Sequence, residues 1–199
     1  MGPIGVLCLQ GDFREHLQTF EALGVETVRV RKPADLEGLK GLVIPGGEST
    51  VIDKLSSTFG LRDPIIELIG RGLPVFGTCA GLILLADRIV DGVATQKTFG
   101  GLDVTVQRNA FGSQLESFEA DIRFEGIEEP VRAAFIRAPI VLETGPEVSV
   151  LATLNDGRVG AVRQGNVLGI SFHPEVTGET AIHEYFAQMC KTVDFKSRN

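Results

Sequence analysis

Short apolar runs alternate with amphipathic segments through the first half of the chain. We expect buried strands where nearly every position is apolar, at residues 4–9, 27–30, 42–44 and 74–76. Apolar residues at helical spacing predict helices at residues 12–23, 50–59, 64–71 and 82–87. Strands that are apolar on both faces and are followed by helices predict a parallel sheet covered on both sides.

The first predicted helix has recognisable end signals. Asp12 followed by Glu15 resembles a capping box, and Gly24 stands where a helix C-terminal glycine is expected. These two signals place the helix between the first and second strands.

The second half is richer in strands, which we expect at residues 103–107, 117–122, 133–136, 148–154, 159–163 and 167–172. Turn residues at 155–157 and 165–166 predict that the last three form an antiparallel meander. An amphipathic helix over 179–191 ends the pattern. We therefore expect one α/β domain over 1–199, with an open, mostly parallel sheet, helices on both faces and an antiparallel β extension.

Composition narrows the class of protein. Of 199 residues, 43% are hydrophobic and 23% are charged, which is typical of a globular chain. Glycine contributes 24 of the 199 residues, or about 12%, against a usual ~7%. The backbone must therefore turn tightly at many points. A net charge of −7, without any basic cluster, argues against nucleic-acid binding.

The chain also lacks membrane and secretion signals. The longest apolar stretch with helical character, 82–86, is far shorter than the roughly 20 residues that span a bilayer. The start of the chain does not resemble a signal peptide. Cys8, Cys79 and Cys190 are odd in number and scattered, so a disulfide framework or a zinc site is not expected. We expect a cytoplasmic protein without metal or cofactor.

The segment Gly77-Thr78-Cys79-Ala80-Gly81 joins a predicted strand to a predicted helix. A nucleophile between two glycines at such a junction has the form of a nucleophile elbow. The amino end of the helix would favour the thiolate of Cys79. The alternative interpretation is a buried cysteine with only a structural role.

The tripeptide His173-Pro174-Glu175 follows the last predicted strand. On an extended chain, residues i and i+2 face the same way, so Glu175 would orient His173 as the base for a thiol. The other histidines, His16 and His183, are expected at helix surfaces or boundaries.

The segment 45–50, Pro-Gly-Gly-Glu-Ser-Thr, lies after another predicted strand. Its glycines suit an oxyanion hole made of backbone amides. A phosphate-binding loop is rejected, because the lysine and hydroxyl of that motif are replaced and Glu48 would repel phosphate. Arg108 and Arg137, at strand ends, are either surface ion pairs or ligands of a substrate carboxylate.

Together, the motifs at 77–81, 45–49 and 171–175 resemble the class I, triad-type glutamine amidotransferases, whose fold is flavodoxin-like. The segments 5–11, 14–16, 108–112 and 135–139 further resemble the glutaminase subunits of two-component pyridoxal 5′-phosphate synthases. This resemblance extends over nearly the whole chain.

The resemblance implies that the chain hydrolyses L-glutamine to L-glutamate and ammonia. It implies Cys79 as nucleophile, His173 as base and acid, and Glu175 as the residue that orients the histidine. It also implies a glutamine site and a pair of oxyanion donors, Gly47 and Ala80; the glutamine site comprises Gly47, Glu48, Ser49, Arg108, Ile136 and Arg137. Ammonia would pass to a separate synthase subunit, and Gln10 is a candidate for coupling that partner's docking to activity.

Three alternatives remain open at this point. The chain could be a glutaminase that serves another synthase, such as the imidazole glycerol phosphate system. It could be a catalytically idle docking subunit, although Cys79, His173 and Glu175 are all present. A cysteine peptidase shares the elbow, but it does not explain the 45–50 loop together with the two arginine segments.

Overall fold

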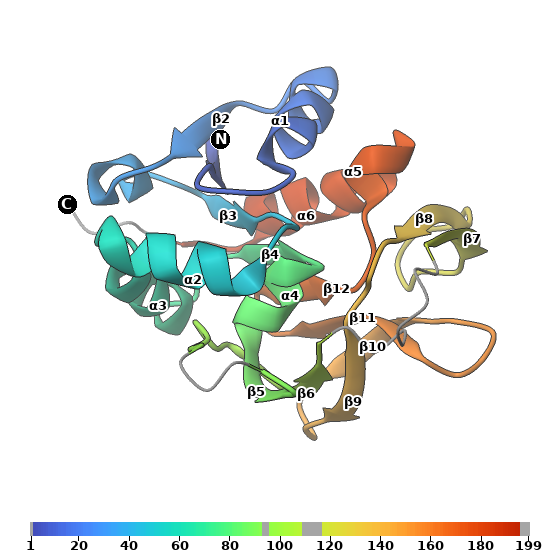
Figure 1. The fold of residues 1–199 in the computed structure, drawn as a ribbon. Helices are drawn as coiled ribbons and strands as arrows, with labels where there is room; N and C mark the ends of the chain where they lie inside the picture. Colours follow the sequence, from blue (N-terminus) through green and yellow to red (C-terminus); the bar gives the residue numbers. More distant parts are fainter. Residues whose placement is uncertain (1, 93–95, 109–116, 196–199) are drawn as a thin grey trace.

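The computed structural model describes residues 2–92, 96–108 and 117–195. Figure 1 shows a central sheet with helices on two sides and a strand-rich region at one end. Among the described residues, no helix is long and apolar enough to cross a membrane.

Five parallel strands form the part of the sheet that carries the site, in the order β2-β1-β3-β4-β12. They are β1 (Ile4–Leu7), β2 (Thr27–Val30), β3 (Gly41–Ile44), β4 (Val75–Thr78) and β12 (Val167–Ile170). All but β2 are buried at every position, as the continuous apolar runs predicted.

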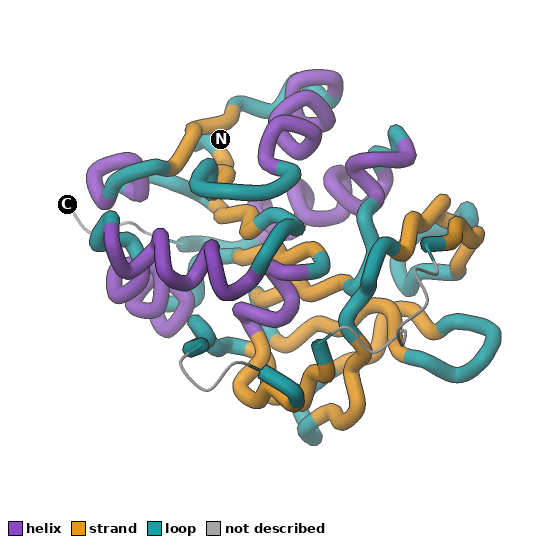
Figure 2. The backbone as a smooth tube through the Cα atoms, in the orientation of Figure 1, coloured by secondary structure: helices purple, strands orange, loops and turns teal. Residues whose placement is uncertain are grey.

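Successive side chains of these strands enter two different hydrophobic clusters. Leu42 and Ile44 pack in one cluster, whereas Val43 between them packs in the other, because strand side chains alternate between the faces of a sheet. Helices cover both faces (Figures 1 and 2). One face packs against α2 (Ser49–Thr58), α3 (Arg62–Gly70) and α4 (Ala80–Leu85), and the other against α1 (Phe13–Ala22) and α6 (Ala181–Thr192).

Beyond β12 the sheet becomes antiparallel, through β11 (Val159–Gln164), β9 (Ile140–Thr144) and β6 (Leu102–Gln107). The strand β10 (Ser149–Thr153) pairs with β11, and β5 (Ala86–Val90) pairs parallel with β6 at the edge. A separate antiparallel pair joins β7 (Phe118–Ile122) and β8 (Val131–Phe135). The predicted mostly parallel sheet, its antiparallel extension and the final meander are confirmed.

Several predictions of detail are wrong. The helix predicted at 82–87 begins earlier, at Ala80, and stops at Leu85, where the chain turns into the unpredicted strand β5. The strand β9 was missed, as were two short helices, η1 (Pro33–Leu36) and α5 (Pro174–Thr177). The glycine predicted at the C-terminal end of α1 is, in contrast, confirmed: Gly24 follows the helix with a φ of 66°.

The capping box predicted for α1 does not form. Asp12 occupies the N-cap position, but its side chain makes no capping hydrogen bond. Its carboxylate instead lies near His173, with Oδ2 at 3.4 Å from Nδ1. The side chain of Asp12 therefore faces His173 and does not cap the helix.

Candidate active site

Four loops meet at one edge of the sheet, because β1, β3, β4 and β12 are parallel and adjacent. Their carboxyl ends lead into the segments 8–12, 45–48, 79 and 171–173. This edge is where open α/β sheets place their ligand sites. The fold therefore brings together the motifs that the sequence singled out.

Cys79 lies on a sharp turn between β4 and α4. Its φ of 49° and ψ of −98° are strained for a residue with a side chain. The flanking glycines permit the turn: a Cβ at Gly77 would lie 2.6 Å from the carbonyl carbon of Gly81, and one at Gly81 would lie 2.1 Å from the oxygen of Ile44. The geometry is that of the predicted elbow.

His173 and Glu175 form a buried pair. Nδ1 of His173 and Oε1 of Glu175 are 2.8 Å apart, and both residues are less than 10% exposed. The backbone between them is not extended as predicted, because His173 is the N-cap of α5 and Glu175 lies in its first turn. The backbone amide of His173 donates to the oxygen of Ala134, which ties the turn to β8.

The electrostatics couple this pair to Cys79. Burial alone would lower the pKa of His173, but interactions with Cys79 and then Glu175 outweigh it and raise that pKa to about 10. Burial raises the pKa of Glu175 above its ordinary value, while the partner His173 opposes the rise. These interactions favour a charged imidazolium at His173, next to the sulfur of Cys79.

One group of side chains in the described part of the chain has metal-ligand geometry. Ligand atoms of Asp12, His173 and Glu175 all lie within 4.8 Å of one another. Two of the three are the hydrogen-bonded pair beside Cys79, so we assign this group to the cysteine–histidine–glutamate site.

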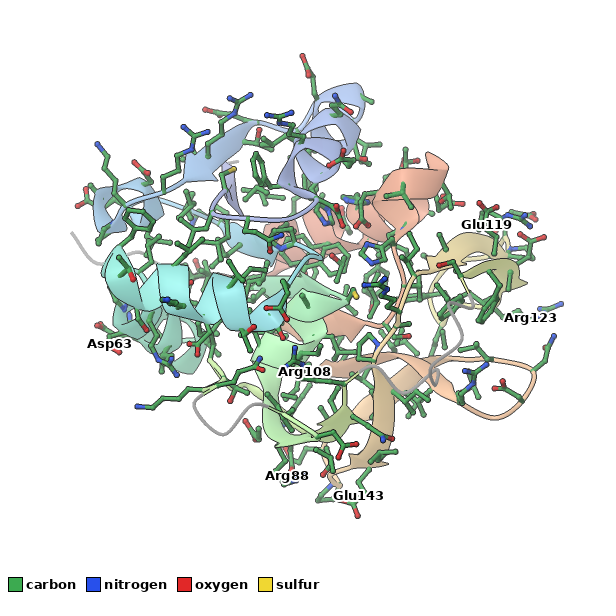
Figure 3. All side chains as sticks on the ribbon, in the orientation of Figure 1. Asp63, Arg88, Arg108, Glu119, Arg123 and Glu143 are labelled. Carbon is green, nitrogen blue, oxygen red and sulfur yellow. The ribbon has the colours of Figure 1, made fainter. Side chains whose placement is uncertain are left out.

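A chain of hydrogen bonds runs beside the elbow, from the first turn of α2 to the end of β6. Nη2 of Arg108 donates to Oε1 of Glu48 at 2.7 Å, and Nη1 donates to Oε1 of Gln96 at 2.8 Å. Nε2 of Gln96 in turn donates to Oγ of Ser49 at 2.9 Å. Figure 3 shows Arg108 near α2. Sequence reasoning missed Gln96, which no motif distinguishes.

Glu48 also caps α2, since its side chain accepts hydrogen bonds from the amide of Val51 and the hydroxyl of Thr50. Partial burial raises the pKa of Glu48, but the hydrogen bonds from Thr50 and Val51, together with the charge of Arg108, outweigh it and lower that pKa. Glu48 therefore stays ionised near Arg108. Arg108 forms an ion pair with Glu48, as one of its two predicted alternatives had it. The Arg108 side chain is only 12% exposed, so this is not an ordinary surface pair.

The third predicted segment of the glutamine site follows β8. The carbonyl oxygen of Ile136 lies 4.0 Å from Sγ of Cys79. Arg137 is exposed and has a φ of 47°. The rest of the predicted 108–112 motif lies outside the described residues.

Gln10 connects the loop after β1 to the loop after β3. Its Oε1 accepts a hydrogen bond of 2.8 Å from the amide of Glu48, and the amide of Asp12 donates to the oxygen of Gly46 at 3.0 Å. Gly47 is exposed with φ of 147°, and a Cβ there would lie 2.6 Å from Oε1 of Gln10. Ala80, the other predicted oxyanion donor, is the first residue of α4.

The prediction that His16 and His183 lie at helix surfaces or boundaries is wrong. Both are completely buried, with Nδ1 of His16 at 2.8 Å from Nε2 of His183. A sequence signal existed: His16 stands three residues after Phe13 and four before Phe20, on the apolar face of α1.

A cysteine on a strand-to-helix elbow, next to a buried histidine–glutamate pair, is the arrangement expected of a triad-type glutamine amidotransferase. The sequence profile of the SNO glutamine amidotransferase family matches residues 6–192. The chain belongs to this family. The predicted family, fold class and glutaminase activity are thereby confirmed.

Individual relatives are consistent with this family. The chain is 61% identical over 184 residues to the pyridoxal 5′-phosphate synthase subunit PdxT of Leifsonia xyli subsp. xyli (strain CTCB07), covering 92% of this chain and 93% of that protein. It is 58% identical over 190 residues to the PdxT subunit of Clavibacter michiganensis subsp. michiganensis (strain NCPPB 382), covering 94% and 91%. A crystal structure described as a glutamine amidotransferase superposes with a TM-score of 0.90 at 48% identity, covering 96% of this chain and 100% of that one.

Proposed function

We propose that Cys79, His173 and Glu175 hydrolyse the side-chain amide of L-glutamine through a γ-glutamyl thioester. The observation that carries this proposal is the elbow cysteine next to the buried His173–Glu175 pair. The thiolate of Cys79 attacks the amide carbon, and the imidazolium of His173 gives its proton to the leaving ammonia. His173 then takes a proton from water, which attacks the thioester and releases glutamate.

Glu175 holds the imidazole in place and stabilises its charge during both steps. This is the third role of a triad, and the 2.8 Å contact with Nδ1 suits it. The oxyanion of each tetrahedral intermediate would be bound by the backbone amides of Gly47 and Ala80, at the ends of adjacent parallel strands.

We assign glutamine binding to the loops on either side of Cys79. The proposed set is Gly47, Glu48, Ser49, Arg108, Ile136 and Arg137. The hydrogen bonds among Glu48, Arg108, Gln96 and Ser49 support this assignment, since they fix polar groups beside the nucleophile before substrate arrives.

We further propose that ammonia passes to a pyridoxal 5′-phosphate synthase subunit that docks on this chain, as the names of the relatives suggest. Residues 1–199 would act as one glutaminase domain, because both hydrophobic clusters share the central sheet. Three free cysteines suit the reducing cytoplasm.

The test is transfer of isotope-labelled nitrogen. Glutamine labelled with ¹⁵N at the amide is supplied to the reconstituted complex of this chain and the synthase subunit, with its pentose and triose phosphate substrates. The label is expected in the pyridine ring nitrogen of the product. Label that appears only as free ammonium, with no labelled product, would contradict delivery to this synthase.

A further inference from the structure

A pair of buried histidines lies directly behind the histidine–glutamate pair. His16, on α1, has Nε2 at 3.1 Å from Oγ1 of Thr78 and at 3.5 Å from Oε1 of Glu175. His183, on α6, has Nε2 at 2.8 Å from Nδ1 of His16. The contacts form a continuous polar line from α6 through α1 to the carboxylate that faces His173.

Both histidines are neutral. Burial lowers the pKa of His183 to about 3. Burial, followed by the nearby His183 and His173, lowers the pKa of His16 well below 6.5. The rings of Phe20 and Phe76 stand edge-on to His183, with centroids 5.0 and 5.7 Å away, and exclude water from this end of the line.

The neighbouring carboxylate selects the tautomer of His16. A lone pair on Nε2 would face the Oε1 of Glu175 at 3.5 Å, so the proton belongs on Nε2, which then donates to Oγ1 of Thr78 at 3.1 Å. Nδ1 of His16 then accepts a hydrogen bond from Nε2–H of His183. This leaves Nδ1 of His183 as a bare acceptor without a hydrogen-bond partner among the described residues, which costs less than a buried, unpaired N–H.

We infer that His16 and His183 are positioning residues, which hold the Glu175 carboxylate in the orientation that serves His173. The contacts at Oε1 set the orientation of the carboxylate, because its other oxygen, Oε2, is buried and makes no hydrogen bond within the described part of the chain. The N–H of His16 therefore adds attraction at Oε1, the same oxygen that lies 2.8 Å from Nδ1 of His173, and His183 fixes the ring and tautomer of His16. No proton moves along the line during the reaction.

This inference rests on the proposed function, because it assigns the support of the proposed triad. His16→Phe removes both nitrogens at similar ring volume. His16→Gln keeps a donor near the position of Nε2. His183→Phe removes only the hydrogen bond between His183 and His16, and it leaves the other contacts of His16 in place. Phe20→Leu is the matched control, because Phe20 is fully buried and contacts the same ring without any polar atom.

Two measurements are made on each variant. One is kcat and KM for glutamine in the complex with the synthase subunit. The other is the rate of Cys79 alkylation by iodoacetamide against pH without glutamine, followed by mass spectrometry of the Cys79 peptide. Alkylation reports on the Cys79–His173 pair even if the wild-type complex proves to release no ammonia, so failure of the proposed function is separable from failure of this inference.

We expect His16→Phe to lower kcat about tenfold with KM within about twofold, and to move the alkylation profile to higher pH. His16→Gln restores most of both, and His183→Phe gives a smaller effect in the same direction. Because the two histidines act in series, the double variant is no worse than His16→Phe alone. Phe20→Leu lowers the melting temperature but leaves the profile unchanged.

The inference is overturned if His16→Phe keeps the wild-type kcat and alkylation profile. It is also overturned if Phe20→Leu shifts that profile as far as His16→Phe does, since both effects would then come from core packing. If His16→Phe shows no cooperative thermal transition, the comparison of His183→Phe with Phe20→Leu decides in the same way.

Discussion

The guanidinium of Arg108 donates a hydrogen bond of 2.7 Å to the carboxylate of Glu48, which joins the end of β6 to the first turn of α2. The Arg108 side chain is 12% exposed and that of Glu48 is 45% exposed. Partial burial makes such a charged hydrogen bond stronger than an exposed ion pair. The contact therefore fixes the loop that follows β3 beside the elbow.

Arg108→Met is expected to raise KM for glutamine about tenfold, equivalent to about 1.4 kcal/mol of binding, with a smaller change in kcat. The variant frees Glu48 and Gln96 from their common partner, so the loop is no longer fixed before substrate arrives. Steady-state kinetics measure the split between KM and kcat. Arg88→Met is the control, because Arg88 on the edge strand β5 (Figure 3) makes a 2.7 Å ion pair with Asp103 through side chains that are both exposed. Equal effects of both variants would refute the assignment.

Gly46 allows the imidazole of His173 to approach the β3 loop closely. A Cβ at Gly46 would lie 2.3 Å from Cε1 and 2.9 Å from Nδ1 of that ring, so Gly46→Ala must displace it. We expect kcat to fall about 100-fold, since small misplacements of catalytic groups are costly. Gly70→Ala is the control, because a Cβ there meets nothing within 4 Å. Wild-type kcat in Gly46→Ala would contradict the placement of His173.

Gln10 is expected to couple docking of the synthase to activity, because it holds the amide of Glu48 next to Gly47. In Gln10→Ala, the ratio of glutaminase rates with and without the synthase subunit should change by about tenfold, the effect of one hydrogen bond to the loop. Gln18→Ala, an exposed position on α1, should keep the wild-type ratio. An unchanged ratio in Gln10→Ala would exclude this role.

The neutral state of His183 makes stability depend on pH. In the unfolded chain this histidine binds a proton below its ordinary pKa of 6.5, whereas in the folded protein it does so only near 3. The contribution of this group therefore lowers the free energy of unfolding by about 1.4 kcal/mol per pH unit as pH falls below 6.5. Relative to the wild type, His183→Phe should gain about 2 kcal/mol between pH 7 and pH 5. Urea denaturation at both pH values measures this difference, and parallel pH profiles would contradict it.

The parallel half of the sheet was predictable because its strands are apolar at every position. The strand β5 was not, since the apolar run through Ala86 continues the pattern of α4 without a break. The strand β9 was missed because three of its five residues are exposed, which leaves no regular alternation to detect.

The site was predictable where a residue type and its local spacing carry the chemistry, as in Cys79 between glycines. Contacts between distant segments were not. His16 and His183 are 167 positions apart, and only the packing of α1 against α6 places them behind Glu175. Likewise, Asp12 stands where the sequence predicts a capping residue, but its carboxylate faces His173. Local patterns identify helix ends and nucleophiles, whereas tertiary packing decides which buried polar groups meet.

The most direct measurement is ammonia release from glutamine by the complex with the synthase subunit, comparing Cys79→Ala with Cys190→Ala. Burial raises the pKa of Cys190 to about 12, so Cys190 remains a thiol, and its replacement should leave the rate near that of the wild type. Both variants must still bind the synthase subunit. Cys79→Ala is predicted to reduce ammonia release to background, and release at the wild-type rate by that variant would contradict Cys79 as the nucleophile.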